Sequence, residues 1–276
     1  MTKKIVVISV VLGLMAAGSV LATPSFPVAQ LSTPGVQKTL ILPPAAAHSP
    51  VISLGPAVDP GSGKIVEGYA IIHYKKGYGK PPWAGGGKGK GETKCYGFLA
   101  KGAKWRTVEQ WIVNPANIRG LDENFILNNL TADIDKWENA ASANILGIGS
   151  STFDILLADI VSPDNKNEVY FADIESSGAI AVTIIWGIFG GPPSQRELVE
   201  WDQVYDDVDY DWSSSGEAGK MDFENIATHE LGHSVGLDDL YDSNCSEETM
   251  YGYADYGEIN KQDLNAGDII GISKLY

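Results

Sequence analysis

Residues 229–239 read HELGHSVGLDD. His229 and His233 are four positions apart, so on an α-helix both imidazoles lie on one face, where they can share one metal ion such as zinc. Glu230 directly follows the first histidine and is placed to take a proton from a metal-bound water rather than to bind the metal. Gly236 can adopt the left-handed conformation that ends the helix and reverses the chain.

The chain reversal brings a third ligand toward the two histidines. Asp239 lies ten residues after His229, and this spacing makes it the expected third ligand. Its neighbour Asp238 is the alternative if the turn is one residue tighter. The sequence therefore predicts a metal site of two histidines and one aspartate.

The extended pattern H-E-x-x-H-x-x-G-x-x-D resembles that of the metzincin metallopeptidases, whose third ligand is usually histidine and sometimes aspartate. Residues 248–252, ETMYG, resemble the methionine turn that underlies the zinc site in that clan. Residues 260–276 resemble the final helix of matrixin-type catalytic domains, and residues 236–247 are also similar to snapalysin. The resemblance covers residues 95 to 276 and is strongest after residue 220.

The resemblance implies an α+β, zincin-like fold with a twisted mixed β-sheet, an active-site helix, a long packing helix and a C-terminal helix. It also implies a zinc-dependent endopeptidase that hydrolyses peptide bonds through a zinc-bound water. In that reading zinc is held by His229, His233 and Asp239, Glu230 is the catalytic base, and Met250 is an apolar floor beneath the ligands.

The sequence leaves open whether the chain binds a calcium ion with a structural role. The acidic residues 206, 207, 209 and 211 are either calcium ligands or a solvated loop, and their spacing does not match an EF-hand. Only His48 and His73 remain outside the motif, both upstream of the catalytic region, so the second, histidine-rich zinc site of many matrixins is not expected.

The N-terminus has the pattern of a secretory signal. Lys3 and Lys4 precede an apolar run over residues 5–21 that ends at Ala22, which predicts a signal peptide over residues 1–22. The alternative is an uncleaved anchor. We therefore expect a secreted, extracellular protein, with retention at the cell surface left open and no stable membrane insertion after the signal is removed.

The segment between the signal and the catalytic domain is different in composition. Residues 23–94 are rich in proline and glycine and are predicted to be a propeptide or linker, with one strand over 64–74. Residues 95–276 are predicted to be the catalytic domain. If residues 23–94 are a propeptide, the chain is a zymogen.

The net charge of the chain limits the classes of molecule that it can bind. The formal net charge is −15, and residues 107–276 hold 32 acidic against 7 basic residues. Such an acidic surface repels phosphates, which argues against nucleic acid. We expect a monomer that acts on a peptide or protein substrate.

The chain has two cysteines, Cys95 and Cys245, a number that fits an exported protein with one disulfide. The alternative is a cysteine switch, in which a Cys95 thiolate occupies the zinc. The residues around Cys95 lack the P-R-C-G-x-P-D string of matrixin switches.

Apolar periodicity and turn residues place the remaining elements. Helices are expected over residues 122–141, from an Asp222 cap to Gly236, and from an Asn265 cap onward with Ile269, Ile270, Ile272 and Leu275 buried. Strands are expected over 109–114, 153–160, 169–174, 178–183 and 197–206. Residues 178–183 are either the family's edge strand, on which a substrate pairs, or an ordinary buried strand.

Two rival functions remain. One is a catalytically silent, zinc-stabilised surface or binding protein, and the other is a zinc hydrolase of small amides. The presence of Glu230 favours an enzyme over a silent protein, and an edge strand beside the cleft favours peptides over small amides.

Overall fold

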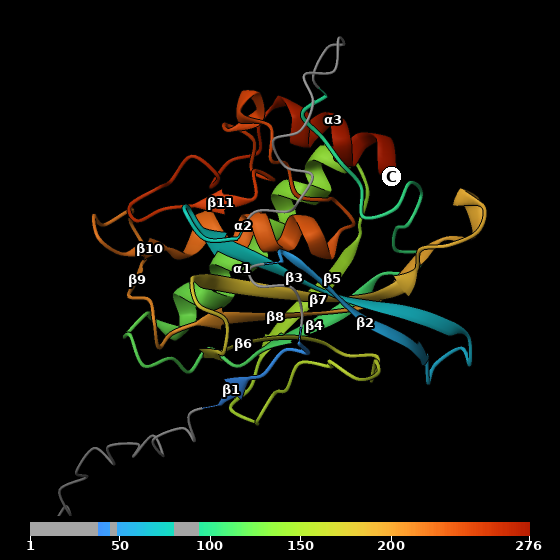
Figure 1. Ribbon diagram of the computed structural model, residues 1–276, viewed down its shortest axis with the longest axis horizontal. Helices are drawn as coiled ribbons and strands as arrows, with labels where there is room; N and C mark the ends of the chain where they lie inside the picture. The colour runs from blue at the N-terminus through green and yellow to red at the C-terminus, as the bar shows by residue number, and fades with distance from the viewer. Residues whose placement is uncertain (1–37, 45–48, 80–93) are drawn as a thin grey trace, which may run out of the picture. The chain divides into compact units, whose positions relative to one another are not determined.

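A mixed β-sheet forms the centre of the computed structural model, which describes residues 38–44, 49–79 and 94–276 (Figure 1). Four parallel strands lie in the order β5-β4-β6-β8, and β7 pairs antiparallel with β8. Their bounds are β4 Glu109–Val113, β5 Leu146–Ser151, β6 Asn167–Ile174, β7 Ala179–Ile188 and β8 Glu197–Asp206. The predicted strand over 197–206 is confirmed, as are those near 109–114 and 169–174.

The N-terminal residues extend this sheet. They form β1 Thr39–Leu40, β2 Val51–Val58 and β3 Ile65–Lys75. Strand β3 pairs antiparallel with β7, and β2 pairs antiparallel with β3, so β2 and β3 form a hairpin joined to the sheet along β7. Two short strands complete the sheet. Strand β1 pairs with β6, and β11 (Tyr253–Ala254) pairs with β3.

Strand β7 is therefore paired on both sides, by β3 and by β8. Of the two interpretations left open for residues 178–183, the structure has the buried strand and not the open edge strand in this form of the chain. The reason is the β2–β3 hairpin, which supplies the backbone partners that an edge strand would leave free.

The compact unit that contains the sheet spans Val36–Tyr276. It includes much of the segment predicted to be a propeptide or linker, and no structural division falls at residue 95. Whether the chain is cleaved ahead of residue 95 stays a prediction. The predicted signal peptide, residues 1–22, lies outside the described residues.

Three helices cover one face of the sheet (Figure 1). Helix α1 (Glu123–Ala141) begins at Asp122, whose carboxylate accepts the Phe125 N–H at 2.9 Å, a standard N-cap. Its apolar residues recur every three or four positions, so one face packs into the core, where burial of each large side chain contributes about 1.5–3 kcal/mol. The buried apolar residues are Ile126, Leu130, Ile134 and Trp137.

Helix α2 (Phe223–Ser234) carries the metal motif and is capped as expected by Asp222, which accepts the Asn225 N–H at 3.0 Å. Gly236 has φ +104°, a conformation that L side chains rarely adopt, and the chain reverses there as predicted. Helix α3 (Ala266–Leu275) follows an Asn265 cap. It buries Ile272 and Leu275, but the expectation that Ile269 and Ile270 are buried is wrong, because they face solvent.

The shorter elements are β9 Trp212–Ser213, β10 Met221–Asp222 and the 3₁₀ turns Pro193–Gln195 and Ser243–Cys245. The expected α+β class, with a twisted mixed sheet and three helices, is confirmed. Within the described part of the chain, no helix is long and apolar enough to cross a membrane.

The strand predicted over residues 153–160 is wrong. The strand is instead β5, which reads LGIGSS, and its low β-propensity concealed it. Gly149 is required there because a Cβ would lie 2.1 Å from the Trp111 ring, which packs across the strand. Residues 153–160 lie in the following loop, and their apolar side chains Phe153, Ile155 and Leu157 are exposed.

A disulfide joins Cys95 to Cys245 across 150 residues. The predicted pairing is confirmed, and no Cys95 thiolate remains for a cysteine switch. Closing a loop of this length lowers the entropy of the unfolded chain and stabilises the fold by about 5 kcal/mol in the loop-entropy account. The bond also fixes residues 95–99 beside the turn after α2, where the Leu99 N–H donates to the Gly236 carbonyl at 3.1 Å.

Candidate metal centre and active site

Helix α2 holds both histidines of the motif in fixed orientations. The Nδ1–H of His229 donates to the Thr249 carbonyl at 2.7 Å, and that of His233 donates to the Leu237 carbonyl at 3.0 Å. These bonds select the tautomer whose Nε2 carries a lone pair, which is the form that binds metals. Both Nε2 atoms are buried and have no hydrogen-bond partner in the described part of the chain.

The turn after Gly236 brings Asp239 to the same point. Its Oδ1 lies 3.2 Å from the His229 Nε2 and 3.4 Å from the His233 Nε2. Its other oxygen, Oδ2, accepts a hydrogen bond from the Tyr241 hydroxyl at 2.8 Å. The alternative residue, Asp238, does not join this set, and its Oδ1 accepts the Asp239 backbone N–H at 3.0 Å.

The geometry of these three side chains fits zinc. Their ligand atoms lie within 4.8 Å of one another, and all three are buried atoms without a partner among the described residues. Two ligands that each lie about 2.0–2.1 Å from a tetrahedral zinc are about 3.3 Å apart. The separations of 3.2 and 3.4 Å from Asp239 agree with that value. Zinc would be held by His229, His233 and Asp239.

Met250 packs against helix α2 at Gly232, next to His233, and its role as the floor of the site stays a prediction. A Cβ at Gly232, which separates the two histidines on the helix, would be 2.2 Å from the Met250 sulfur, so a glycine is required at the contact. Asp268 of α3 fixes the turn that carries Met250, because its carboxylate accepts the Thr249 N–H at 2.7 Å and the Met250 N–H at 3.1 Å. The C-terminal helix thus supports the turn that carries Met250.

Glu230 lies beside the three candidate zinc ligands, and each of its carboxylate oxygens has a hydrogen-bond partner. Oε1 is 3.1 Å from the Nδ1 of His73, and Oε2 accepts the Thr183 hydroxyl at 2.6 Å. Burial raises the pKa of Glu230 to about 7. A carboxyl with a pKa near neutrality is suited both to accept and to return a proton.

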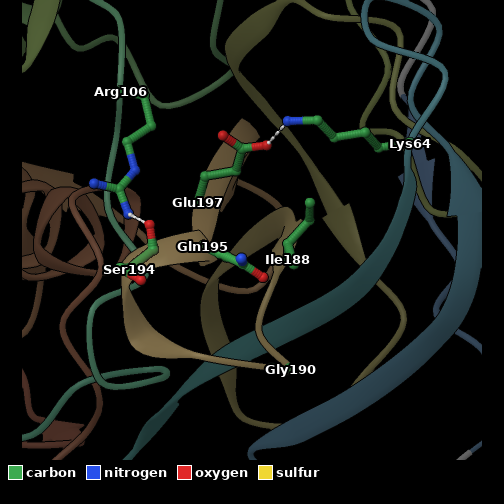
Figure 2. A pocket seen from close by; sticks show the side chains of 8 residues that line it. Lys64, Arg106, Ile188, Gly190, Ser194, Gln195 and Glu197 are labelled. Atoms are coloured by element: carbon green, nitrogen blue, oxygen red, sulfur yellow. Dashed lines mark hydrogen bonds and ion pairs between the residues drawn. The ribbon is translucent and has the colours of Figure 1, made fainter.

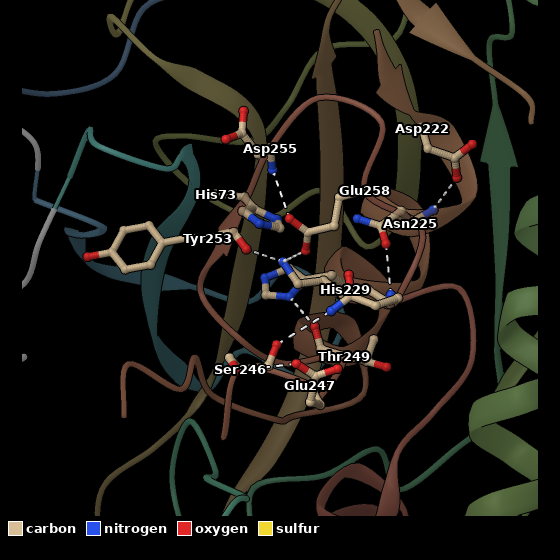
Figure 3. Close-up of polar contacts among 12 residues, drawn as sticks. His73, Asp222, Asn225, His229, Ser246, Glu247, Thr249, Tyr253, Asp255 and Glu258 are labelled. Carbon is tan, nitrogen blue, oxygen red and sulfur yellow. Dashed lines mark hydrogen bonds and ion pairs between the residues drawn. The ribbon is translucent and has the colours of Figure 1, made fainter. Parts of the chain in front are cut away.

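His73 is the unexpected member of the site. It belongs to β3, and its ring centroid lies 3.9 Å from that of His229 (Figure 3). Burial lowers the pKa of His73 well below its ordinary value, so the ring is neutral and its Nδ1–H donates to Glu230. The position of His73 in the sequence predicts a place outside the catalytic region, but the antiparallel pairing of β3 with β7 brings it to the site.

His73, His229 and Glu230 form a second triplet of potential metal ligands that shares His229 with the first. The first set fits a metal better, since each of its three ligand atoms lacks a partner. In the second set the Glu230 carboxylate already has two hydrogen-bond partners. This difference separates the residues suited to hold zinc from the residue suited to move a proton.

The site is closed to solvent. His73, His229, Glu230 and His233 are each no more than 1% exposed, and the Asp239 side chain is 3% exposed. Strand β3 contributes to this closure, because Ile71 lies opposite Thr183 and His73 opposite Ala181 in its pairing with β7. A substrate carbonyl cannot reach Glu230 while β3 remains in place.

A hollow of about 550 Å³ lies elsewhere, at the turn between β7 and β8 (Figure 2). An ion pair between Lys64 and Glu197, 2.5 Å apart, borders it, and Arg106 donates to the Ser194 carbonyl at 3.2 Å. The residues that line it include no histidine and none of the metal set. This hollow is not part of the candidate site.

The acidic residues of the 206–211 loop bind groups within that loop and in the neighbouring segment near residue 118. Oδ1 of Asp206 accepts the N–H groups of Val208 and Asp209, each at 2.8 Å. Oδ2 of Asp207 accepts the Ile118 N–H at 2.8 Å. Asp206 and Asp207 are buried, so the solvated-loop interpretation is wrong for these two residues.

The twisted mixed sheet, the three helices and the turn at Met250 form an α+β fold that is consistent with a metzincin catalytic domain. Within that class, residues 194–276 match the matrixin family (Peptidase_M10), and this segment contains Glu230, the three candidate ligands and Met250. The match confirms the matrixin-like character inferred from the sequence and supports a zinc metallopeptidase.

Among solved structures, metalloproteinase-II from Bacteroides fragilis is 14% identical with a TM-score of 0.34. The match covers 64% of this chain and 54% of that one, so the chain spans about half the length of that protein. No curated protein matches the sequence.

Proposed function

We propose that the chain is a secreted, zinc-dependent endopeptidase in which Glu230 is the catalytic base. The observation that carries the proposal is the convergence of three buried ligand atoms, none with a hydrogen-bond partner among the described residues, beside the buried carboxyl of Glu230. The predicted signal peptide and the Cys95–Cys245 disulfide support export, because disulfides persist in oxidising compartments.

Zinc in such a site supplies Lewis acidity toward water and toward a carbonyl oxygen. His229, His233 and Asp239 would hold it, and the carbonyls of Thr249 and Leu237 keep both histidines in the ligand tautomer. Glu230 takes a proton at a carboxylate oxygen and returns it to the leaving amine. Because Asp239 is anionic, it offsets part of the charge of the ion.

We further infer that the closed form is latent, in agreement with the predicted zymogen. An extended peptide can bind an exposed strand by antiparallel pairing, and β3 already occupies this position on β7. His73 then lies over Glu230 and occupies its Oε1. The β2–β3 hairpin thus blocks both the strand on which a substrate would pair and the base that would act on it.

The hairpin is suited to leave as one piece. Strand β2 pairs with β3 alone among the described strands. Strand β3 pairs with β7 of the main sheet on one side and with the two-residue strand β11 on the other. Residues 77–91, between β3 and the catalytic segment, are rich in glycine and lysine, a composition that proteases cut readily when it is accessible. Cleavage there would break the covalent connection between the hairpin and residues 95–276. The pairings of β3 with β7 and of β1 with β6 must then open for the hairpin to leave.

A second candidate is a catalytically silent, zinc-stabilised protein. The observation that favours it is the complete burial of Glu230 beneath β3. In that reading the hairpin is a permanent part of the sheet, and the metal only stabilises the fold. Release of the hairpin distinguishes the two candidates.

The ligand set is tested by comparing neighbouring aspartates. Asp239→Asn is expected to lower zinc affinity by about 10-fold or more, because it removes the anionic ligand while it preserves the shape of the side chain. Asp238→Asn, the matched control, is expected to bind zinc like the parent. The measurement is titration with zinc against a competing chelator. Weaker binding in Asp238→Asn with normal binding in Asp239→Asn would reassign the ligand.

A further inference from the structure

The side chains of β3 alternate between the two faces of the sheet, as they do in any strand. Tyr69, Ile71 and His73 face the helices. Ile71 belongs to the core cluster that contains the buried apolar residues of α2, Tyr69 packs against that cluster, and His73 contacts Glu230. Ile72 belongs instead to the cluster on the opposite face. Three side chains of β3 therefore occupy the space between β7 and the active-site helix.

Each of these three side chains lies opposite a residue of β7. The pairs are His73 with Ala181, Ile71 with Thr183, and Tyr69 with Ile185. Thr183 identifies the face, because its hydroxyl donates to Glu230 at 2.6 Å. Directly opposed residues of an antiparallel pair have Cβ atoms about 4.5–5.5 Å apart, so their side chains interact. A peptide that replaced β3 in the same register would contact the same three residues of β7.

The position of Ile71 is closed and apolar. Its side chain is 1% exposed, whereas that of Ile65, at the start of the same strand, is 64% exposed. Burial of an aliphatic side chain of this size favours binding by about 10- to 100-fold. A charged side chain there would lose its water without gaining a partner. This position therefore discriminates between peptides.

The position of Tyr69 is aromatic. Its ring lies 5.3 Å from that of Phe189, which directly follows β7, and the two planes meet at 73°. This edge-to-face arrangement is favourable for aromatic pairs and contributes about 2- to 10-fold to an affinity. Phe189 would contact an aromatic side chain placed two positions before the aliphatic one.

The regular pairing with β7 ends beside the metal set. The register between β3 and β7 shifts between His73 and Tyr74, and Tyr74 pairs in parallel with Tyr253 of β11. The uninterrupted antiparallel pairing thus lies on the N-terminal side of the residue that contacts Glu230. Selection of side chains by β7 is expected on this side.

We propose that the space occupied by β3 selects extended peptide segments with a large aliphatic residue two positions before the residue that contacts Glu230, and an aromatic residue four positions before it. The substrate class is an unfolded, apolar stretch of a protein, and a charge at the aliphatic position excludes it. The inference rests on the proposed function, because it takes β3 to lie where a substrate lies.

The test uses the full chain, cut by a site-specific protease at a recognition sequence placed at residues 85–87, with both parts kept together. The chain carries Glu230→Gln, so that binding is measured without hydrolysis, and zinc is present. The probe is a fluorescent synthetic peptide with the sequence of residues 64–76. Peptide and hairpin compete for one position, so the ratio of two apparent Kd values does not depend on how much hairpin stays bound.

The peptide with Ile71→Asp is expected to bind about 100-fold or more weakly than the parent peptide, measured by fluorescence anisotropy. The matched control, Ile65→Asp, changes the same residue type at an exposed position and should bind within about threefold of the parent. Phe189→Ala in the protein and Tyr69→Ala in the peptide should each weaken binding by about 2- to 10-fold. Their combined effect should be smaller than the product, because both remove one ring contact.

Equal binding of the Ile71→Asp and Ile65→Asp peptides would overturn the proposal, and so would no binding of the parent peptide by a folded, zinc-loaded chain. Independent effects of Phe189→Ala and Tyr69→Ala would overturn the aromatic preference. The predicted order of binding in a chain that hydrolyses nothing would support the selection while contradicting the peptidase. Hydrolysis by the Glu230 form that ignores the Ile71→Asp change would contradict the selection alone.

Discussion

Replacing Glu230 with glutamine is expected to lower kcat/KM for peptide hydrolysis by about 10²–10⁴-fold in the chain freed of its hairpin. Glutamine preserves the size of the side chain and can still hydrogen bond to Thr183, whose hydroxyl lies 2.6 Å from the carboxylate. It cannot take up a proton as a carboxylate does. Zinc content is expected to remain at the parent level, because Glu230 is not among the three unpartnered ligand atoms.

The matched control is Glu224→Gln, on the same helix. Glu224 pairs with Lys136 at 2.6 Å and lies in the first turn of α2, away from the metal set. It should retain hydrolysis near the parent level. Activity of Glu230→Gln within tenfold of the parent, at equal zinc content, would contradict the role of Glu230 as the base.

Release of the β2–β3 hairpin is expected to raise peptidase activity by about 100-fold or more over the intact chain. A site that is closed in 99% of molecules is weakened about 100-fold toward its substrate. With β3 removed, the free backbone groups of β7 can pair with a substrate, and Glu230 loses its contact with His73.

The experiment places a recognition sequence for a site-specific protease at residues 85–87, cuts the purified chain there and separates the N-terminal fragment. Activity, zinc content and circular dichroism are measured before cutting, after cutting and after separation. The same procedure on Glu230→Gln is the control for hydrolysis by the added protease. A rise in activity that requires Glu230 would support latency.

A second variant opens the site without cutting the chain. A Cβ at Gly68 of β3 would lie 2.5–2.7 Å from the Trp186 ring of β7, so Gly68→Ala is expected to weaken the pairing of these strands. Faster hydrogen exchange in β7 should accompany a rise in activity. If the hairpin separates, the remainder stays folded with zinc bound, and no form hydrolyses peptides, the silent zinc-stabilised protein is the better account.

The helices and most of the sheet could be predicted because their signals are local. Asp222 and Gly236 mark the ends of α2 by capping and by a positive φ, and four residues of spacing place His229 and His233 on one face. The ten-residue spacing from His229 likewise predicted that Asp239 lies beside the two histidines. Strand β5 escaped prediction because two of its six residues are glycines, one of which, Gly149, leaves the space that the Trp111 ring occupies.

His73 could not be predicted to reach the site, since it is 157 residues from Glu230 and only strand pairing joins them. The available signal was a lone histidine in an apolar strand of a chain with four histidines. Thr183 and Tyr241 were missed for a related reason. Neither belongs to a recognisable motif in its own segment. Their roles follow from the carboxylates that they contact, Glu230 for Thr183 and Asp239 for Tyr241.

The most direct test of the central claim is hydrolysis of an unfolded protein substrate by the hairpin-free chain, before and after removal of metal. The account predicts one zinc per chain, loss of hydrolysis on chelation and recovery when zinc is restored. Hydrolysis that persists in the fully chelated protein would contradict it, and so would a folded, zinc-loaded, hairpin-free chain that cleaves nothing.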